Sequence, residues 1–326
     1  MTRCVLEVDD LRVGVGHMLS PTLVDGVTLR VHAGECLGLV GESGSGKSLT
    51  LRSMLGLLPP TLQHSTGGFR FADADGTLRT QHPRDLRGRG VSMVFQEPMS
   101  SLNPTMRVGD LVSAGCRANG MSRKAAAGRA VELLAEVGVP DPRRRCRAWP
   151  HELSGGLRQR VMIAMALSVE PRLLLCDEPT TALDVTVQDQ ILALIERLRS
   201  ELDLAVIFVS HDLGVIARVA DRTAVMYAGR IVEEGPTREV VDAPRHPYTR
   251  GLVESVPRIS STATRLATIP GNPPAAGHFP AGCRFAPRCE LAEDACRTQQ
   301  PPLTDSGENH STACLRHSLL TIGQHP

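Results

Sequence analysis

Residues 41–48 read G-E-S-G-S-G-K-S, and this stretch decides the fold class. The apolar run E-C-L-G-L-V at residues 35–40 predicts a buried strand before it, and the pattern over residues 47–58 predicts a helix after it. Glycines let the backbone turn closely around phosphate oxygens, while successive N–H groups point inward at a helix N-terminus, which favours an anion. A strand, a glycine-rich loop and a helix in this order predict a nucleotide-binding α/β domain.

Two side chains of this loop carry specific chemistry. Lys47 can reach the β- and γ-phosphates of a nucleotide, and the hydroxyl of Ser48 can ligate Mg²⁺. The loop alone does not say which nucleotide binds. The residues that we expect to hold the phosphates are Ser43, Gly44, Ser45, Gly46, Lys47, Ser48 and Leu49.

A second stretch, L-L-L-C-D-E-P-T at residues 173–180, predicts a buried strand that ends in two acidic residues. Asp177 is placed to hold Mg²⁺ through water, and Glu178 can polarise an attacking water as a general base. A buried strand that ends in a solvated acidic turn is the alternative. The phosphate loop upstream favours the metal-binding interpretation, because it requires a partner for its metal.

The remaining pattern up to about residue 256 alternates between strands and helices. Short alternating segments within residues 4–31 predict antiparallel strands. The later succession is typical of a parallel α/β sheet. Its expected elements are a helical region over 106–139 that is broken at glycines, helices over 157–169 and 187–201, and buried strands over 173–176 and 205–209.

The character of the sequence changes after residue 256. Gly, Pro, Ser and Thr dominate and strong periodicity ends, so we expect one domain over residues 1–256 and a small extension over residues 257–326. Four cysteines lie in that extension, separated by five, six and seventeen residues: Cys283, Cys289, Cys296 and Cys314.

Composition limits the function classes. Of 326 residues, 41% are hydrophobic and 22% charged, which is ordinary for a globular protein. The net charge of +1 and the 3% aromatic content argue against a nucleic-acid partner. No apolar run reaches about eighteen residues, and the start M-T-R-C-V-L-E-V-D-D turns acidic where a signal peptide needs apolar residues. We therefore expect a soluble protein of the cytosol.

The stretch L-S-G-G-L-R-Q-R at residues 153–160 resembles the signature motif of ATP-binding cassette (ABC) ATPases. Other motifs of that family follow in order: Gln96 in V-F-Q-E-P, Ala182–Asp184 in A-L-D, and His211 in V-S-H-D-L. The resemblance covers about residues 5–255. It implies a P-loop (RecA-like) ABC nucleotide-binding domain with an antiparallel β subdomain and an α-helical subdomain at about residues 98–168.

The resemblance also implies roles for single residues. Two subunits pair head to tail, so that the signature residues of each contact the ATP held by the other. His211 contacts the γ-phosphate, and Gln96 contacts the metal and the surface that couples to transport. The residues so assigned are Ser154, Gly155, Gly156 and Gln159 for the partner's ATP, Asp184 for the D-loop, Glu178 and His211 for catalysis, and Ser48, Gln96 and Asp177 for Mg²⁺.

One position departs from the family pattern. Members of the family stack an aromatic ring from the first strand pair on adenine, whereas this chain has Val15 there, with His17 nearby. Loss of a stacking ring costs on the order of 1–3 kcal/mol, judged from stacking on nucleic-acid bases. Another side chain stacks on adenine, or selectivity for the base is loose.

Several longer stretches resemble the ATPase subunits of oligopeptide and dipeptide permeases, whose relatives include nickel importers. They are Q-E-P-M-S-S-L-N-P, T-A-L-D-V-T-V-Q and H-P-Y-T-R-G-L. This resemblance implies a peripheral subunit on the cytoplasmic face of the membrane. It also implies a second ABC ATPase (in a heterodimer or homodimer), two membrane permease subunits and an extracytoplasmic solute-binding protein. The alternatives are an importer of nickel or metal chelates, a soluble ABC ATPase without a transport role, and an exporter.

The four cysteines of the extension have several interpretations. Thiolates in a loop-rich segment can ligate a [4Fe–4S] cluster or Zn²⁺. Zinc sites more often contain pairs two to four residues apart, which favours the cluster here, and some oligopeptide-permease ATPases carry one in a similar extension. Unliganded or oxidised thiols, or a lid that packs against the partner subunit, are the alternatives.

Overall fold

The computed structural model of this chain describes residues 3–16, 19–73, 75–181, 183–256 and 268–320. The chain divides into two compact units. The first unit contains the residues up to Leu6, Val31–Glu35 and Arg70–Ile207. The second unit contains Glu7–Arg30, Cys36–Phe69 and the residues from Phe208 onward.

The first unit is built around two parallel strands, β7 (Val91–Val94) and β8 (Leu173–Asp177). In their register Val91 lies opposite Leu173. Every residue of β8 is buried, as expected for a parallel strand with both faces covered, and its sequence is therefore a continuous apolar run. The strand β9 (Ala205–Ser210) starts beside β8 and carries the chain into the second unit.

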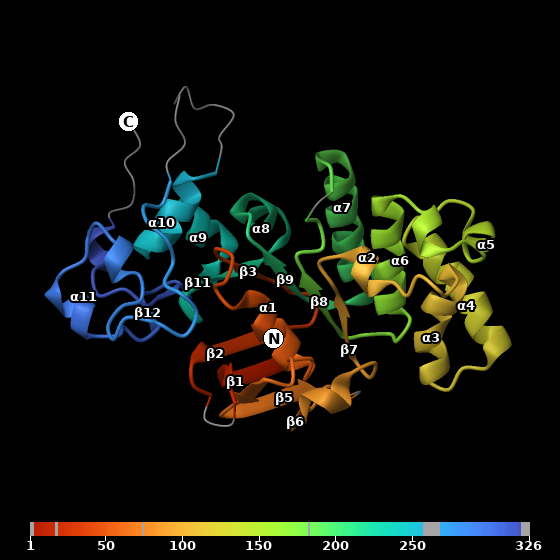
Figure 1. The fold of residues 1–326 in the computed structure, drawn as a ribbon, viewed down its shortest axis with the longest axis horizontal. Helices are drawn as coiled ribbons and strands as arrows, with labels where there is room; N and C mark the ends of the chain where they lie inside the picture. Colours follow the sequence, from red (N-terminus) through yellow and green to blue (C-terminus); the bar gives the residue numbers. More distant parts are fainter. Residues whose placement is uncertain (1–2, 17–18, 74, 182, 257–267, 321–326) are drawn as a thin grey trace. The chain divides into compact units, whose positions relative to one another are not determined.

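Helices α3 (Val108–Ala118), α4 (Arg123–Glu136) and α6 (Gly155–Leu167) pack against one another in the first unit (Figure 1). Helix α3 buries Val108, Leu111 and Val112, whose spacing of three and four residues places them on one face. The other helices of this unit are α2 (Pro98–Ser101), α5 (Pro142–Arg145) and α7 (Val185–Leu202).

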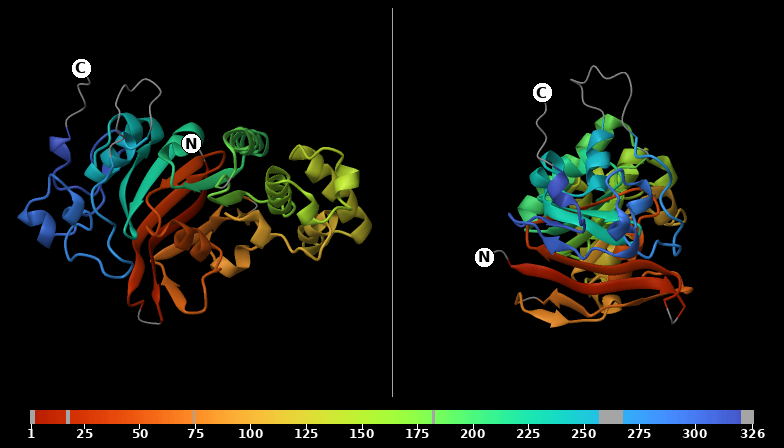
Figure 2. Two further views of the ribbon diagram at one scale, coloured as in Figure 1. Left: turned by 45° about the horizontal axis from the view of Figure 1, so that its top comes forward. Right: turned by 90° about the vertical axis from the view of Figure 1, so that its left-hand side faces the viewer.

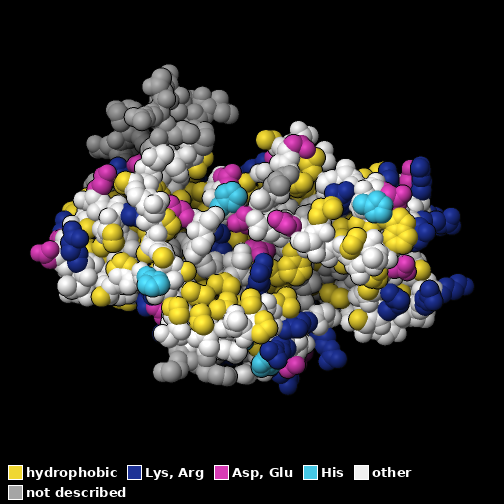
Figure 3. All heavy atoms as spheres, in the orientation of Figure 1, with side chains coloured by type: hydrophobic (Ala, Val, Ile, Leu, Met, Phe, Trp, Pro, Cys, Tyr) yellow, Lys and Arg dark blue, Asp and Glu magenta, His cyan; other side chains and the backbone are white. Residues whose placement is uncertain are grey.

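Positive charge is concentrated on this group of helices. Arg143, Arg144 and Arg147 are exposed in and after α5, and Arg123 and Lys124 are exposed at the start of α4. In Figure 3 the dark blue side chains gather over α4 and α5. The net charge of +1 hides this local excess, so the net charge alone does not say which surfaces attract anions.

The second unit holds a sheet with the strand order β12-β13-β11-β10-β3, followed by the end of β9. Strands β3 (Cys36–Val40) and β10 (Arg222–Tyr227) are parallel, and β10 forms an antiparallel hairpin with β11 (Arg230–Pro236). Helix α8 packs on β3, which is buried along its whole length. The helices of this unit before the extension are α1 (Lys47–Met54), α8 (Leu213–Val219), α9 (Thr237–Asp242) and α10 (Pro247–Glu254).

The long N-terminal strands β1 (Cys4–Val15) and β2 (Thr22–His32) lie side by side (Figure 2). In the second unit β1 also pairs with β4 (Leu62–Ser65) in antiparallel fashion. Buried and exposed residues alternate along β2 from Gly26 to Val31, which is the period of a strand with one covered face. In the first unit β5 (Gly68–Ala72) and β6 (Leu78–Thr80) form another antiparallel pair.

The C-terminal extension contributes to the sheet of the second unit. Its strand β13 (Ser311–Thr312) pairs with β11 on one side and with β12 (Thr304–Asp305) on the other. The His310 ring bonds to the Glu233 carboxylate at 2.7 Å, and both side chains are fully buried. The short helix α11 (Asp294–Thr298) precedes these strands. The domain boundary predicted between residues 256 and 257 borders residues outside the described set and stays a prediction.

Predicted and observed elements agree in position and differ at their ends. The helix predicted over 47–58 ends at Met54, and the helix predicted over 157–169 runs from Gly155 to Leu167. The predicted helical region over 106–139 is divided into α3 and α4. The strands β4 to β7 and the hairpin of β10 and β11 were not predicted from the sequence. Among the described helices, none is long and apolar enough to cross a membrane.

Asp25 on β2 connects three parts of the second unit. Its carboxylate accepts hydrogen bonds from Arg12 at 2.9 Å and from Arg230 at 2.7 Å, and it pairs with the buried Arg284 of the extension. Burial alone would raise the pKa of Asp25, but the hydrogen bond and charge of Arg230, with the charges of Arg284 and Arg12, outweigh burial and lower it. The ionised carboxylate therefore stabilises this unit.

We expect Asp25→Asn to lower the free energy of unfolding by about 3 kcal/mol at pH 7, because it leaves a buried guanidinium without its counter-charge. Since folding lowers the pKa of Asp25, this stabilisation is present above the carboxyl's unfolded pKa of about 4 and disappears as the pH falls through the folded value. Urea unfolding at a series of pH values measures the difference between the two proteins.

The matched control is Asp10→Asn, which removes a half-exposed ion pair with Arg12 and should cost less than about 1 kcal/mol. Equal free energies of unfolding for the wild type and Asp25→Asn at pH 7 would contradict a stabilising role of this carboxylate.

Candidate functional site

The loop at residues 41–48 connects β3 to α1 in the second unit. Lys47 is 4% exposed, and its Nζ donates to the carbonyl of Gly41 at 2.7 Å and to that of Glu42 at 3.0 Å. The ammonium group thus lies over the backbone of its own loop. Ser43 and Gly44 are exposed at the opposite end of the turn, so the loop is open to solvent where we expect the phosphates.

Glycine is required in this loop for steric reasons. A Cβ on Gly41 would lie 2.0 Å from the carbonyl oxygen of Met226 on β10, and Gly44 has a φ of 79°. Among the described residues the hydroxyl of Ser45 has no hydrogen-bond partner, although it is buried. A close turn of backbone before a helix, with a polar atom facing inward, can receive an anion.

The first unit supplies the two predicted acidic residues at the end of β8. Asp177 is fully buried, and Glu178 has a φ of 47°, in the left-handed region that non-glycine residues seldom adopt. The Glu178 carboxylate accepts hydrogen bonds from Gln96 at 3.2 Å and from Thr181 at 3.0 Å. The structure therefore brings the predicted base and the predicted Gln96 into contact.

Thr181 is a contact that the sequence analysis did not identify. It follows Glu178 by three residues in E-P-T-T, and the turn that places Glu178 in the left-handed region returns the Thr181 hydroxyl to the carboxylate. A hydroxyl three residues after an acidic residue in a tight turn is a weak sequence signal for such a contact.

The signature residues lie at the start of α6 in the first unit. Ser154 caps this helix and accepts a hydrogen bond from the N–H of Leu157 at 3.4 Å. Ser154 and Gly155 are exposed, so the positive end of the helix dipole faces solvent. Gln159 is only 1% exposed. A contact of Gln159 with a partner's nucleotide stays a prediction, and the exposed residues offer the clearer site.

Asp184 and His211 lie at or next to helix starts. Asp184 caps α7 and accepts a hydrogen bond from the N–H of Val187 at 2.9 Å, whereas Ala182 of the same motif lies outside the described residues. His211 is exposed and directly precedes Asp212, which caps α8. Val15 is 40% exposed, and His17 is outside the described residues. Their roles toward ATP stay predictions.

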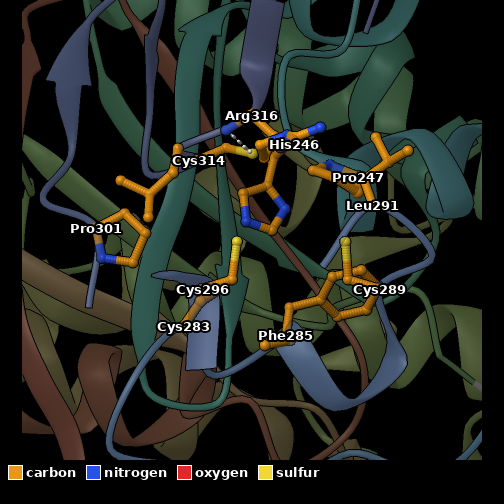
Figure 4. Close-up of a pocket in the computed structure, with 12 residues that line it drawn as sticks. His246, Pro247, Cys283, Phe285, Cys289, Leu291, Cys296, Pro301, Cys314 and Arg316 are labelled. Carbon is orange, nitrogen blue, oxygen red and sulfur yellow. Dashed lines mark hydrogen bonds between the residues drawn. The ribbon is translucent and has the colours of Figure 1, made fainter. Parts of the chain in front are cut away.

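The four cysteines of the extension line one pocket of the second unit, together with His246, Phe285 and Pro301 (Figure 4). Burial raises the pKa of Cys283 and Cys289 and raises that of Cys314 to about 11. Among the described residues no three His, Cys, Asp or Glu side chains are placed to hold one metal ion. The predicted gathering of the cysteines is observed, but a single-ion site is not.

His246 was not singled out by the sequence analysis, although it begins the quoted stretch H-P-Y-T-R-G-L. Its Nδ1 accepts the N–H of Tyr248 at 3.1 Å, and complete burial lowers its pKa to about 3. The ring is therefore neutral at physiological pH. With Nδ1 acting as an acceptor, the proton resides on Nε2.

Two protein families match the sequence. The family described as ABC transporter matches residues 24–181. The family described as oligopeptide/dipeptide transporter, C-terminal region, matches residues 232–296. The second match includes His246 and three of the four pocket cysteines.

Individual proteins similar to this chain carry names that agree with these two families. A Brucella ovis protein named as a peptide import ATP-binding protein is 48% identical over 307 residues, which cover 90% of this chain and 91% of that protein. The oligopeptide transport ATP-binding protein OppD of Mycobacterium tuberculosis is 46% identical over 331 residues, covering 97% of this chain and 52% of that protein. The solved structure of CbiO1 from Clostridium perfringens, part of the ABC transporter complex CbiONQ, has a TM-score of 0.61 at 25% identity, covering 73% of this chain and 90% of that one. These findings confirm the predicted fold class and the resemblance based on the motifs.

We expect Gly41→Ala to destabilise the chain by about 3 kcal/mol, because the new Cβ would collide with the backbone carbonyl of Met226. Gly44→Ala is the matched control. Its Cβ meets no described atom within 4 Å, so only the left-handed backbone is penalised, at about 1–2 kcal/mol. Urea unfolding of both variants measures the difference, and equal losses would contradict the close approach of Gly41 to β10.

Proposed function

The chain belongs to the ABC transporter family, in the group that carries the oligopeptide/dipeptide transporter C-terminal region, and we propose that it is the ATP-hydrolysing subunit of a peptide importer. The observation that carries this proposal is the presence of both family regions in one chain, with relatives named for peptide import over nine-tenths of its length. A nickel or metal-chelate importer is the second candidate of this group, and no similar protein reported above favours it. A soluble ABC ATPase without a transport role is not favoured either.

The substrate is MgATP. Lys47 and the backbone N–H groups of residues 43–49 bind the phosphates, since a glycine-rich turn before a helix is suited to an anion. Ser48, Gln96 and Asp177 hold Mg²⁺, because hydroxyl, amide and carboxylate oxygens are the ligands that this hard cation prefers. The fully buried Asp177 at the end of β8 supports this role.

Glu178 is the general base for hydrolysis. Its hydrogen bonds from Gln96 and Thr181 hold the carboxylate in one orientation, which a residue that must align a water molecule requires. His211 stabilises charge on the γ-phosphate in the transition state. Gln96 contacts the proposed base directly, so a movement of Gln96 on nucleotide binding also changes the position of Glu178.

The chain works with a second ATPase subunit. The exposed start of α6, capped by Ser154, supports a site for the ATP held by that partner, and Gly155, Gly156 and Asp184 complete it. We assign two membrane permease subunits and an extracytoplasmic solute-binding protein as further partners. The chain then lies at the cytoplasmic face of the membrane as a peripheral subunit, and nucleic acid is not among its partners.

For the pocket of the extension we propose an iron–sulfur cluster rather than zinc. Four cysteine side chains and apolar walls surround it. A single Zn²⁺ needs thiolates at about 2.3 Å and therefore close to one another, and no such group exists among the described residues. A [4Fe–4S] cluster spreads its four cysteine ligands over a larger core. When bound, it would supply structural cross-linking and one-electron chemistry, and hydrolysis of ATP requires neither an electron nor a thiol.

We expect Glu178→Gln to retain MgATP binding and to lower ATP turnover by about 100-fold or more, because the amide cannot accept a proton from water. Turnover is measured in the assembled transporter, and uptake of a labelled peptide should fall in parallel. Glu196→Gln, an exposed glutamate on α7 of the same unit, is the matched control and should keep wild-type turnover.

Normal turnover by Glu178→Gln would exclude Glu178 as the base. The wild type could instead hydrolyse ATP normally without stimulation by any peptide and without peptide uptake. That result would overturn peptide as the cargo but would retain the ATPase assignment.

We expect protein purified without oxygen to be brown and to contain iron and acid-labile sulfide, both of which Cys289→Ser should lose. Replacement of one thiolate removes one of four ligands, so the cluster is no longer held. Cys146→Ser, at a half-buried cysteine of the first unit, is the matched control and should retain both. Colourless protein without iron would contradict the cluster, and stoichiometric zinc would favour the alternative metal.

A further inference from the structure

The segment between Cys283 and Cys289, with the sequence C-R-F-A-P-R-C, reaches the phosphate loop of the same unit. Nη1 of Arg288 donates to Oε2 of Glu42 at 2.7 Å, and Nη2 donates to Oε1 at 2.9 Å. Two parallel bonds of this kind form the strongest pairing of a guanidinium with a carboxylate. Glu42 is the second residue of the loop at residues 41–48, so the extension contacts that loop directly.

The other N–H groups of Arg288 are also hydrogen-bonded. Nε donates to the carbonyl of Pro270 at 2.8 Å, Nη1 to the Tyr227 hydroxyl at 3.3 Å, and Nη2 to the carbonyl of Ile269 at 3.4 Å. The side chain is 5% exposed. Its hydrogen bond to Glu42 is the largest influence on its pKa, which it raises. A buried, charged and fully bonded guanidinium has one position, unlike an arginine on the surface.

Glu42 is held through its backbone as well. Its N–H donates to the hydroxyl of the fully buried Tyr248 at 2.8 Å. The ring of Tyr248 packs against Tyr227 and Phe285 with centroid distances of 4.6 and 5.5 Å. Tyr227 and Tyr248 are the only tyrosines in a sequence with 3% aromatic content. The backbone of Glu42 is therefore held by the aromatic cluster, and its carboxylate is held by Arg288.

The position of Glu42 matters for the phosphates in two ways. First, the carbonyl of Glu42 is one of the two that bind Nζ of Lys47, so a displaced Glu42 displaces the lysine that we assign to the phosphates. Second, the Glu42 carboxylate is a negative charge within an anion-binding loop. Pairing with Arg288 neutralises it and holds it away from an incoming nucleotide.

We propose, on the premise that this loop binds MgATP as argued above, that Arg288 of the C-terminal extension is a positioning residue for the phosphate loop. It acts through Glu42 and does not touch the nucleotide. It keeps the loop in its binding conformation and prevents a free carboxylate from facing the phosphates. The extension thereby forms part of the ATP site of its own chain.

The test is a double-mutant cycle on MgATP binding, measured by calorimetry with the full chain. We expect Arg288→Ala to raise the Kd about tenfold, because a smaller fraction of molecules holds the loop ready and an unpaired carboxylate repels the phosphates. Glu42→Ala should raise the Kd less, about threefold, because no charge is left behind. The double variant should match Glu42→Ala to within about twofold, because Arg288 has nothing left to hold.

Two further variants separate positioning from a general loosening of the extension. Arg288→Lys keeps the charge but cannot form two parallel bonds, so its Kd should lie between those of the wild type and Arg288→Ala. Arg245→Ala removes hydrogen bonds to Ser306 and Gly307 in the extension, away from the loop, and should bind MgATP as the wild type does. In the assembled transporter, Arg288→Ala should raise KM while kcat at saturating MgATP stays near the wild-type value.

The outcomes distinguish the two levels of the proposal. A wild type that does not bind MgATP overturns the proposed function itself. A wild type that binds, with an unchanged Kd for Arg288→Ala, overturns only the positioning role. A double variant as weak as Arg288→Ala means that Arg288 acts through its other contacts, which also overturns it. If thermal unfolding shows that Arg288→Ala does not fold, Arg288→Lys takes its place in the cycle, and its double variant with Glu42→Ala should again match Glu42→Ala.

Discussion

The tight backbone of residues 41–48 is the constraint on which the second unit depends. The loop turns against the carbonyl of Met226 with no room for a Cβ at Gly41, so its backbone packs directly on β10. Backbone hydrogen bonds extend this constraint: the N–H of Gly229 donates to the carbonyl of Ser45, and the carbonyl of Gly229 accepts from the N–H of Asp25. The hairpin of β10 and β11 is thereby fixed to the loop, and β2 is fixed to the hairpin.

The parts of the fold that could be predicted are those with a local cause. The strands β3, β8 and β9 are continuous apolar runs, because both their faces are covered, and the phosphate loop has a sequence that few other structures require. The hairpin of β10 and β11 was missed, since its turn places Ala228 at a φ of 47° and lacks the usual residue pair at that point. The low preference of Ala228 for this backbone conformation is outweighed by the two backbone hydrogen bonds of the neighbouring Gly229.

The candidate site also contains residues that could be predicted from the sequence and contacts that could not. Gln96 and Glu178 were both assigned to the ATP site from their motifs, but their contact depends on the pairing of β7 with β8, and β7 was not predicted. The pairing of Glu42 with Arg288 could not be predicted from the sequence. Arginine supplies all but two of the 36 basic residues, so nothing in the sequence distinguishes Arg288 from the others. Its role depends on burial and on a contact between residues 246 positions apart, which no local pattern encodes.

The extension is connected to the phosphate loop by two independent routes. Arg288 binds Glu42 directly, while Arg284 binds Asp25 and the carbonyl of Ala228, at the same turn whose Gly229 bonds to Ser45. Both arginines lie between Cys283 and Cys289, and both of these cysteines line the pocket of the extension. Any change in how the two cysteines are held must therefore act on the short segment that carries both arginines, because interiors packed this closely transmit displacement. The segment between the two cysteines therefore links the pocket of the extension to the phosphate loop through side-chain contacts, and the extension reaches that loop without contacting the nucleotide.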